Sequence, residues 1–210
     1  MERWVAPAPQ ARELHVVFYS GETSHGFGSL LLVGRTFQIA GVPLDRRWMG
    51  QSTLRETLLH ELCHLWFGGL LHGAGEDPDQ PQEALAGFFT LRLVEALLGS
   101  KAKAASREAL LRQYRAASAL RTDGIPRQFR SRFQAVEGAL TLDGLRDLVG
   151  AEAFDGSMRS YVSHRIAEDR SFSVEGVLDT LEHETGASTR ALLDTLEWRS
   201  AQEVSRPREG

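Results

Sequence analysis

Residues 58–69 read LLHELCHLWFGG, an almost wholly apolar run that carries two histidines and a glutamate. Ionisable side chains are costly to bury without partners, so a chain that folds around this run must satisfy all three. On a helix, His60 and His64 lie one turn apart on the same face and can bind one ion together. Glu61 lies beside them. The run predicts either a metal-binding helix or hydrogen-bonded core histidines with Glu61 at the protein edge.

The spacing His-Glu-x-x-His favours the metal. In the zincin motif the two histidines bind zinc and the glutamate acts as general base. Catalytic zinc takes three protein ligands and leaves a fourth position to water. Candidates for the third ligand are His72, Glu76, Asp77, Asp79 and Glu83. Glu83 differs from the others because it opens the next expected helix and precedes the apolar ALAGFF, although the helix dipole alone also explains an acid there.

The chain around this motif divides into a β-rich first part and a long helical remainder. Runs of β-branched and aromatic residues at 14–20, 29–33 and 36–40 predict a small sheet, and the glycine-rich residues 21–28 predict a loop. A helix from Ser52 to the glycines at 68 and 69 follows, and then a polar loop at 73–82.

Helical spacing covers most of the remaining chain. We expect helices at 83–99, 107–121, 129–149, 152–168, 174–185 and 189–198. Ser106, Ser173 and Ser188 are expected N-caps, and Gly99 and Gly186 are expected stops. The pattern predicts one α+β domain over residues 1–198, with a β-containing part at 14–50, zinc helices at 52–98, a helical lobe at 105–198, and a flexible tail at 199–210.

Composition excludes several classes of protein. A net charge of -4 and a pI near 6.0 provide no general attraction for nucleic acid or for an anionic membrane. No apolar run approaches the roughly 18 residues of a membrane helix, and the N-terminus lacks the pattern of a signal peptide. The single cysteine, Cys63, cannot form an internal disulfide, which suits a reducing compartment. We expect a cytoplasmic protein.

The motif and its flanks resemble the aminopeptidase N family of gluzincins. In that family HExxH is followed after 18 residues by a glutamate ligand, and Trp-Phe-Gly comes directly after the second histidine; here Glu83, Trp66, Phe67 and Gly68 occupy those positions. The resemblance extends over residues 14–198. It implies a thermolysin-like fold with a small N-terminal sheet over the zinc helix and a helical C-terminal lobe. It also implies Zn²⁺ bound by His60, His64 and Glu83, with Glu61 as the base.

Two positions depart from the family pattern. His25 stands where members have the glutamate that grips the substrate's free amino group, and Ala135 stands where they have the tyrosine that stabilises the oxyanion. Loss of one oxyanion donor costs about 10² to 10³ in turnover, which slows such an enzyme without abolishing it. His25 and Tyr161 are the substrate-binding candidates that the sequence offers. The family's additional domains have no counterpart here, so a partner chain is one source of the missing surface.

These observations predict a zinc-dependent metallopeptidase, aminopeptidase-like, that hydrolyses a peptide substrate with zinc-bound water activated by Glu61. One alternative is a zinc-binding pseudo-peptidase that serves as a peptide-binding or scaffold module. This alternative is motivated by His25 and Ala135. A second alternative is a helical interaction protein that binds no metal.

Overall fold

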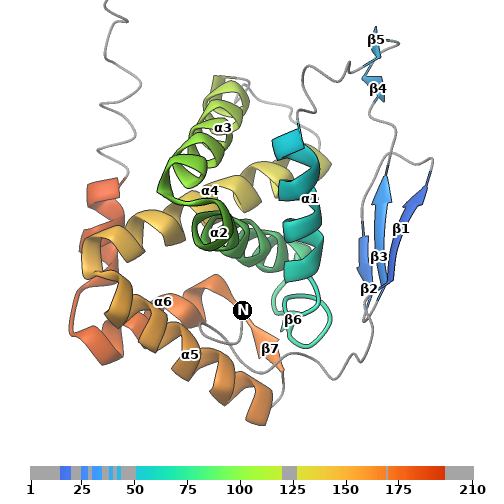
Figure 1. Cartoon of the computed structure of the whole chain (residues 1–210). Coiled ribbons are helices and arrows are strands. Elements are labelled where there is room, and N and C mark those ends of the chain that lie inside the picture. The colour runs from blue at the N-terminus through green and yellow to red at the C-terminus, as the bar shows by residue number, and fades with distance from the viewer. Residues whose placement is uncertain are drawn as a thin grey trace, which may run out of the picture.

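A computed structural model describes the backbone of short strands within residues 15–43 and of residues 51–119, 127–168 and 170–196, with side chains described for 56–115, 136–168 and 170–196 (Figure 1). The helices are α1 (Gln51–Cys63), α2 (Asp79–Leu98), α3 (Ser100–Ala119), α4 (Arg127–Val149), α5 (Ala151–Ala167) and α6 (Val174–Thr185). Residues 189–196 are also helical. The expected tail at 199–210 lies outside the described residues.

The strands form three small sheets. β1 (His15–Tyr19), β3 (Leu30–Gly34) and β2 (His25–Phe27) make a three-stranded sheet in that order, in which β3 is parallel to β1 and antiparallel to β2. The two remaining sheets have two strands each, β4 (Gln38–Ile39) with β5 (Val42–Pro43), and β6 (His72–Gly73) with β7 (Ser171–Phe172). α1 contacts β2 and β3, and the three-stranded sheet stands beside α1 in Figure 1.

The expected α+β, thermolysin-like fold class is wrong, because the molecule is mostly helical. Helices account for 79% of the residues whose side chains are described, and the sheet among those residues is the two-stranded parallel pair β6–β7. The β-branched runs near the N-terminus do form strands, but these have at most five residues. Helices α1 to α6 have 12 to 23 residues each, so helix packing determines the fold class.

α2 lies at the centre of the helices (Figure 1). It contacts α1, α3, α4 and β6, and most of its residues from Ala84 to Val94 are buried. A helix that is apolar around most of its circumference is stable only when other elements cover it on several sides. Phe67 stacks on Phe89 with ring centroids 5.1 Å apart, and Phe88 contacts Phe154 at 5.4 Å. These ring contacts connect α2 to the segment after α1 and to α5.

Several expected helix ends are confirmed. Ser173 caps α6 by accepting a hydrogen bond from the Gly176 amide, and Gly186 ends that helix with a left-handed φ of 68°. Gly99 ends α2. Ser106 is not an N-cap, because α3 begins at Ser100, directly after Gly99. Its hydroxyl instead donates to Glu56 of α1 at 2.6 Å, so it joins two helices.

Two expected loops contain strands. Residues 21–28 include β2, and residues 73–82 begin with the end of β6 and include the start of α2. The β6–β7 pairing brings together segments about a hundred residues apart, which local pattern cannot reveal. None of the helices in the described part of the chain is long and apolar enough to cross a membrane.

Candidate metal centre

Three side chains converge where the end of α1 packs against the start of α2. Nitrogen or oxygen atoms of His60, His64 and Glu83 all lie within 4.8 Å of one another. The Nε2 atoms of the two histidines are 3.2 Å apart. Glu83 places Oε2 3.1 Å from His60 Nε2 and Oε1 3.3 Å from His64 Nε2. Among the described residues, this is the one group of at least three His, Cys, Asp or Glu side chains that could hold a metal ion.

Two packed helices position these side chains. α1 ends at Cys63, one residue before the second histidine and earlier than the expected stop at the glycines that follow. The His64 amide still reaches the carbonyls of His60 and Glu61 at 3.3 and 3.2 Å, so one further turn keeps both imidazoles on one face. α2 packs against α1 and presents Glu83 from its second turn.

The donor distances are compatible with a shared zinc ion. Zinc lies about 2.0–2.2 Å from His nitrogen and carboxylate oxygen, which places neighbouring ligand atoms roughly 3.4 Å apart. The three pairs measured here span 3.1 to 3.3 Å, with Glu83 facing His60 through Oε2 and His64 through Oε1. With one ligand atom taken from each residue, the three atoms lie within 4.8 Å of one another. Two imidazoles and one carboxylate are also a donor set that zinc takes in catalytic sites. The residues therefore fit the ion. The same three groups can also form a metal-free hydrogen-bonded network, in which one imidazole carries a proton for Glu83.

The carbonyl of Phe67 orients His64. It accepts a hydrogen bond from His64 Nδ1 at 3.0 Å, which leaves Nε2 to face His60 and Glu83. A metal-binding histidine commonly donates its other ring N–H to such an acceptor, and this bond fixes the tautomer. The Phe67 side chain is fully buried against Phe89 and Phe172, so the carbonyl is held by the core. The sequence motif included Phe67 but did not predict the hydrogen bond between its carbonyl and His64.

Electrostatics couple the three side chains. Burial would lower the pKa of His64, but the hydrogen bond and charge of Glu83, with smaller effects from the Phe67 carbonyl and the Glu61 charge, raise it above its ordinary value of 6.5. Burial would raise the pKa of Glu83, but the hydrogen bonds from His60 and His64 hold it far below its usual range. Glu83 is therefore a carboxylate, as a metal ligand must be.

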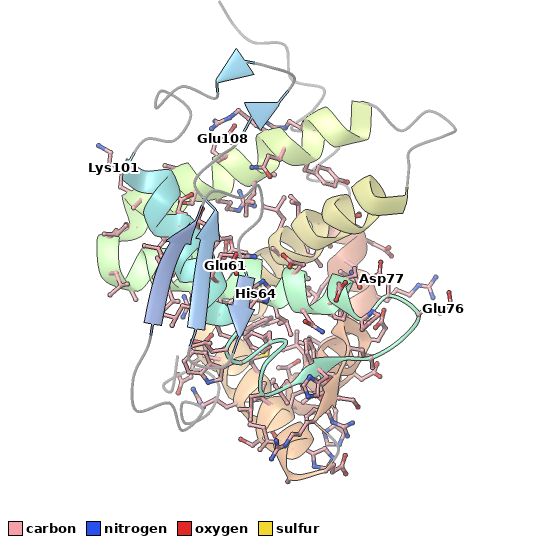
Figure 2. All side chains as sticks on the ribbon, turned by 90° about the vertical axis from the view of Figure 1, so that its right-hand side faces the viewer. Glu61, His64, Glu76, Asp77, Lys101 and Glu108 are labelled. Carbon is pink, nitrogen blue, oxygen red and sulfur yellow. The ribbon has the colours of Figure 1, made fainter. Side chains whose placement is uncertain are left out.

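The site is partly open to solvent. The side chain of Glu83 is 46% exposed and that of His60 is 28% exposed, whereas that of His64 is 13% exposed. Glu61 is buried at 5% exposure, and its negative charge contributes to the pKa of His64, so it lies close to the converging groups. Figure 2 shows Glu61 and His64 on the side of the molecule that carries the three-stranded sheet. The group is thus reachable from solvent, and a buried carboxylate lies near it.

Among the described side chains, the other candidate ligands are not part of this group. Figure 2 places Glu76 and Asp77 on the loop before α2, well apart from His64. Tyr161 is buried in α5, and its hydroxyl is 3.0 Å from the Ser173 amide and 3.3 Å from the Ser173 carbonyl. Its hydroxyl is thus engaged by backbone, and we leave it out of the candidate site. His25 lies in β2 opposite Leu32, and its side chain is outside the described residues.

Cys63 has a packing role. It is fully buried, and its thiol hydrogen-bonds with the hydroxyl of Thr90 on α2. Burial raises the pKa of this thiol from 9.0 to about 12, with only a partial opposing effect of the Thr90 hydrogen bond. The thiolate is the reactive form of cysteine, so Cys63 is neither a ligand nor a nucleophile at neutral pH.

Comparison with known proteins adds no family. No protein-family model matches the sequence, and no curated protein matches it.

Proposed function

We propose that this protein is a zinc-dependent metallopeptidase, aminopeptidase-like, that hydrolyses peptide bonds. The observation that carries the proposal is the convergence of His60, His64 and Glu83: the two histidine Nε2 atoms are 3.2 Å apart, and each lies 3.1 or 3.3 Å from one oxygen of Glu83. The two histidines come from the HExxH motif, and the glutamate comes from the next helix. A cytoplasmic location belongs to the same proposal, because a single buried cysteine suits a reducing compartment.

His60, His64 and Glu83 would hold the ion. When bound, zinc supplies a Lewis acid that lowers the pKa of water and polarises a carbonyl oxygen. The chain's own residues perform the remaining tasks. The Phe67 carbonyl keeps the His64 ring in the orientation that turns Nε2 toward the site. The exposure of Glu83 and His60 leaves room for a peptide to approach from solvent.

Glu61 is the proposed general base. It directly follows His60 and is buried at 5% exposure. A carboxylate in such a place can accept the proton of the attacking water and pass it to the leaving amine, which is the two-way proton transfer that amide hydrolysis requires. Zincins assign the same task to the glutamate at this position of the motif.

The first test is cleavage of a diverse peptide mixture by zinc-loaded protein, read by mass spectrometry. The matched control is Glu61→Gln, which keeps the size and most hydrogen bonds of the side chain but cannot accept the proton. We expect cleavage by the wild type and a loss of at least about 10²-fold in the variant. The positions of the cuts would distinguish N-terminal trimming from internal cleavage.

Zinc analysis accompanies the cleavage test. We expect one zinc per chain in the wild type and in Glu61→Gln, and a strongly reduced content in Glu83→Ala. Glu76→Ala removes an exposed acid from the preceding loop and serves as the control with unchanged zinc. Stoichiometric zinc without cleavage would contradict the peptidase and favour a zinc-binding peptide-recognition module. Absence of zinc in the wild type would contradict both.

A further inference from the structure

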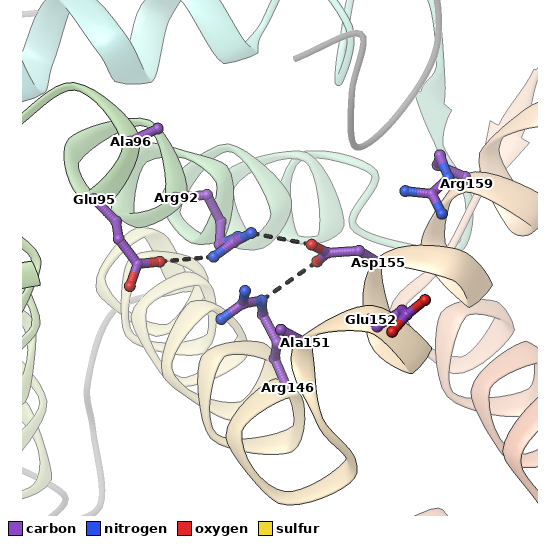
Figure 3. A pocket seen from close by; sticks show the side chains of 8 residues that line it. All are labelled: Arg92, Glu95, Ala96, Arg146, Ala151, Glu152, Asp155 and Arg159. Atoms are coloured by element: carbon purple, nitrogen blue, oxygen red, sulfur yellow. Dashed lines mark hydrogen bonds and ion pairs between the residues drawn. The ribbon is translucent and has the colours of Figure 1, made fainter. Parts of the chain in front are cut away.

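A second candidate site lies toward the opposite end of α2 from Glu83. Charged side chains line a pocket of about 530 Å³, formed by the last turns of α2, the end of α4 and the start of α5 (Figure 3). Arg92 is the first residue of α2 that lines the pocket. It lies nine positions after Glu83, which corresponds to roughly 14 Å along the helix. The pocket is thus separate from the three converging side chains, and its volume is typical of small-molecule sites.

Asp155 holds two arginines at this pocket. Its Oδ2 is 3.1 Å from Arg92 Nη2, and its Oδ1 is 3.3 Å from Arg146 Nε. Arg92 also donates from Nη1 to Glu95 at 2.7 Å. Burial lowers the pKa of Arg92, and the like charge of Arg146 opposes the raising effect of Asp155. Two guanidinium groups are therefore held close together by a single shared carboxylate.

Arg146 retains hydrogen-bonding capacity toward the pocket. Its side chain is only 12% exposed. Among the described residues its ion-pair partner is Asp155, and this pair uses the Nε atom of Arg146. The two terminal nitrogens of its guanidinium turn away from Asp155 in Figure 3. Together they carry four N–H donors in a planar fork, which matches the geometry of a carboxylate. Such a group lining a cavity is suited to bind an oxyanion.

The balance of charge determines which oxyanion fits. The lining contains three arginines, Arg92, Arg146 and Arg159, and three acids, Glu95, Glu152 and Asp155. These charges cancel, so the lining as a whole offers no net attraction to an anion without a positive group. Glu152 is exposed in the first turn of α5 and takes part in none of the ion pairs found among the described residues. It can therefore accept a cation. The pocket thus offers donors at Arg146 and an acceptor at Glu152 to a molecule that carries both charges.

We propose that this pocket binds a small zwitterion of the amino-acid or short-peptide type, with its carboxylate on the terminal nitrogens of Arg146 and its ammonium group on Glu152. Arg92 and Asp155 act as positioning residues, because their ion pairs fix Arg146. The site is independent of the metal centre and goes beyond the proposed peptidase activity.

The test is calorimetric titration of the full, metal-free chain with triglycine up to about 10 mM. We expect saturable binding by the wild type. N-acetylation of the peptide removes its ammonium group, and Glu152→Gln removes the acceptor. Each change should weaken binding about tenfold, and the two together should weaken it no further, because both delete the same ion pair. Arg146→Lys, which keeps the charge but loses the fork, should weaken binding to a similar extent.

Glu83→Ala separates the pocket from the metal centre, since it should leave triglycine binding unchanged. Three results would overturn the proposal: no binding by the wild type, equal binding of free and N-acetylated triglycine, or loss of binding in Glu83→Ala. Glu152 is exposed, so its substitution should leave the fold intact and keeps the test decisive even where Arg146→Lys is unstable. Cleavage activity is not used as a readout, so failure of the peptidase proposal would not affect the result.

Discussion

Phe67 joins the core to the candidate metal centre. Its ring is fully buried and stacks on Phe89, while its carbonyl accepts the hydrogen bond from His64 Nδ1. The ring therefore fixes the position of the backbone atom that orients a proposed ligand. Stability and metal affinity should consequently respond to the same side chain.

Phe67→Ala should lower both quantities. Removal of a buried phenylalanine typically costs about 3–5 kcal/mol of stability, and disturbance of an acceptor behind a histidine ligand typically costs about 10–100-fold in metal affinity. Urea unfolding and a competitive zinc titration measure the two effects. Phe67→Leu fills more of the space and should retain most of the zinc affinity. Unchanged affinity in a folded Phe67→Ala protein would show that the carbonyl is positioned without the ring.

Cys63 should make the stability fall in alkaline solution. Its pKa is about 12 in the folded chain against an ordinary value of 9.0, so between these values the unfolded chain releases a proton that the native chain keeps. The free energy of unfolding should therefore be unaffected below pH 9 and then decrease by about 1.4 kcal/mol per pH unit. Urea titrations from pH 8 to 10.5 measure this slope. Cys63→Ala should show a shallower slope; equal slopes would mean that the thiol is accessible in the native state.

At the scale of elements, the close contact of α2 with α4 holds Glu83 in place. A Cβ atom added at Gly138 of α4 would lie 2.7 Å from the Cβ of Ala84, the residue after Glu83. A Cβ added at Gly87 would lie 3.0 Å from the Cβ of Ala139. Small residues on both helices thus allow the two backbones to approach closely. This close packing sets the position of α2, which carries Glu83, relative to α4.

Gly138→Ala should destabilise the protein even though alanine favours helices. The intrinsic gain is about 1 kcal/mol, whereas overpacking a tight interface typically costs about 1–3 kcal/mol and should also shift Glu83. Gly156→Ala is the matched control, because its Cβ would meet nothing closer than the Arg159 side chain at 4.0 Å. That variant should gain up to about 1 kcal/mol. Thermal unfolding of the two variants compares them directly, and equal melting temperatures would show that α2 and α4 can separate at no cost.

In the molecule as a whole, local patterns predicted the helical segments better than the fold class. One helical turn predicted that His60 and His64 share a face, and the family resemblance singled out Glu83, which does lie beside them. That the three bind a metal stays a prediction. The fold class could not be predicted in the same way. The β-branched and aromatic residues at 14–40 predict strands, but they do not show how small a share of the described residues those strands make up. The β6–β7 pair and the pocket at Arg92 depend on contacts distant in sequence. The one available signal was an arginine inside the apolar run FFTLRLV of α2.

That arginine belongs to a chain of buried and half-buried ion pairs that spans four helices. Lys103 of α3 is 2.8 Å from Asp143 of α4 and 4.0 Å from Glu95 of α2, which in turn pairs with Arg92. Arg107 also reaches Asp143, at 3.3 Å. Asp143 is fully buried and has two cations beside it. Its loss would leave a buried lysine without its nearest counter-charge.

Asp143→Asn should therefore cost about 3–5 kcal/mol of unfolding free energy, because breaking a buried ion pair strands the remaining charge. Added salt should not restore the loss, since buried charges are poorly screened. Glu108→Gln provides the contrast: its carboxylate lies 3.7 Å from Arg112 and 3.6 Å from Arg115 at the surface, where such pairs contribute less than about 1 kcal/mol. Urea unfolding at 0.05 and 1 M NaCl measures both variants. A loss below 1 kcal/mol for Asp143→Asn would mean that water reaches Lys103, and the four-helix ion-pair chain would then contribute little to holding α2 in its central position.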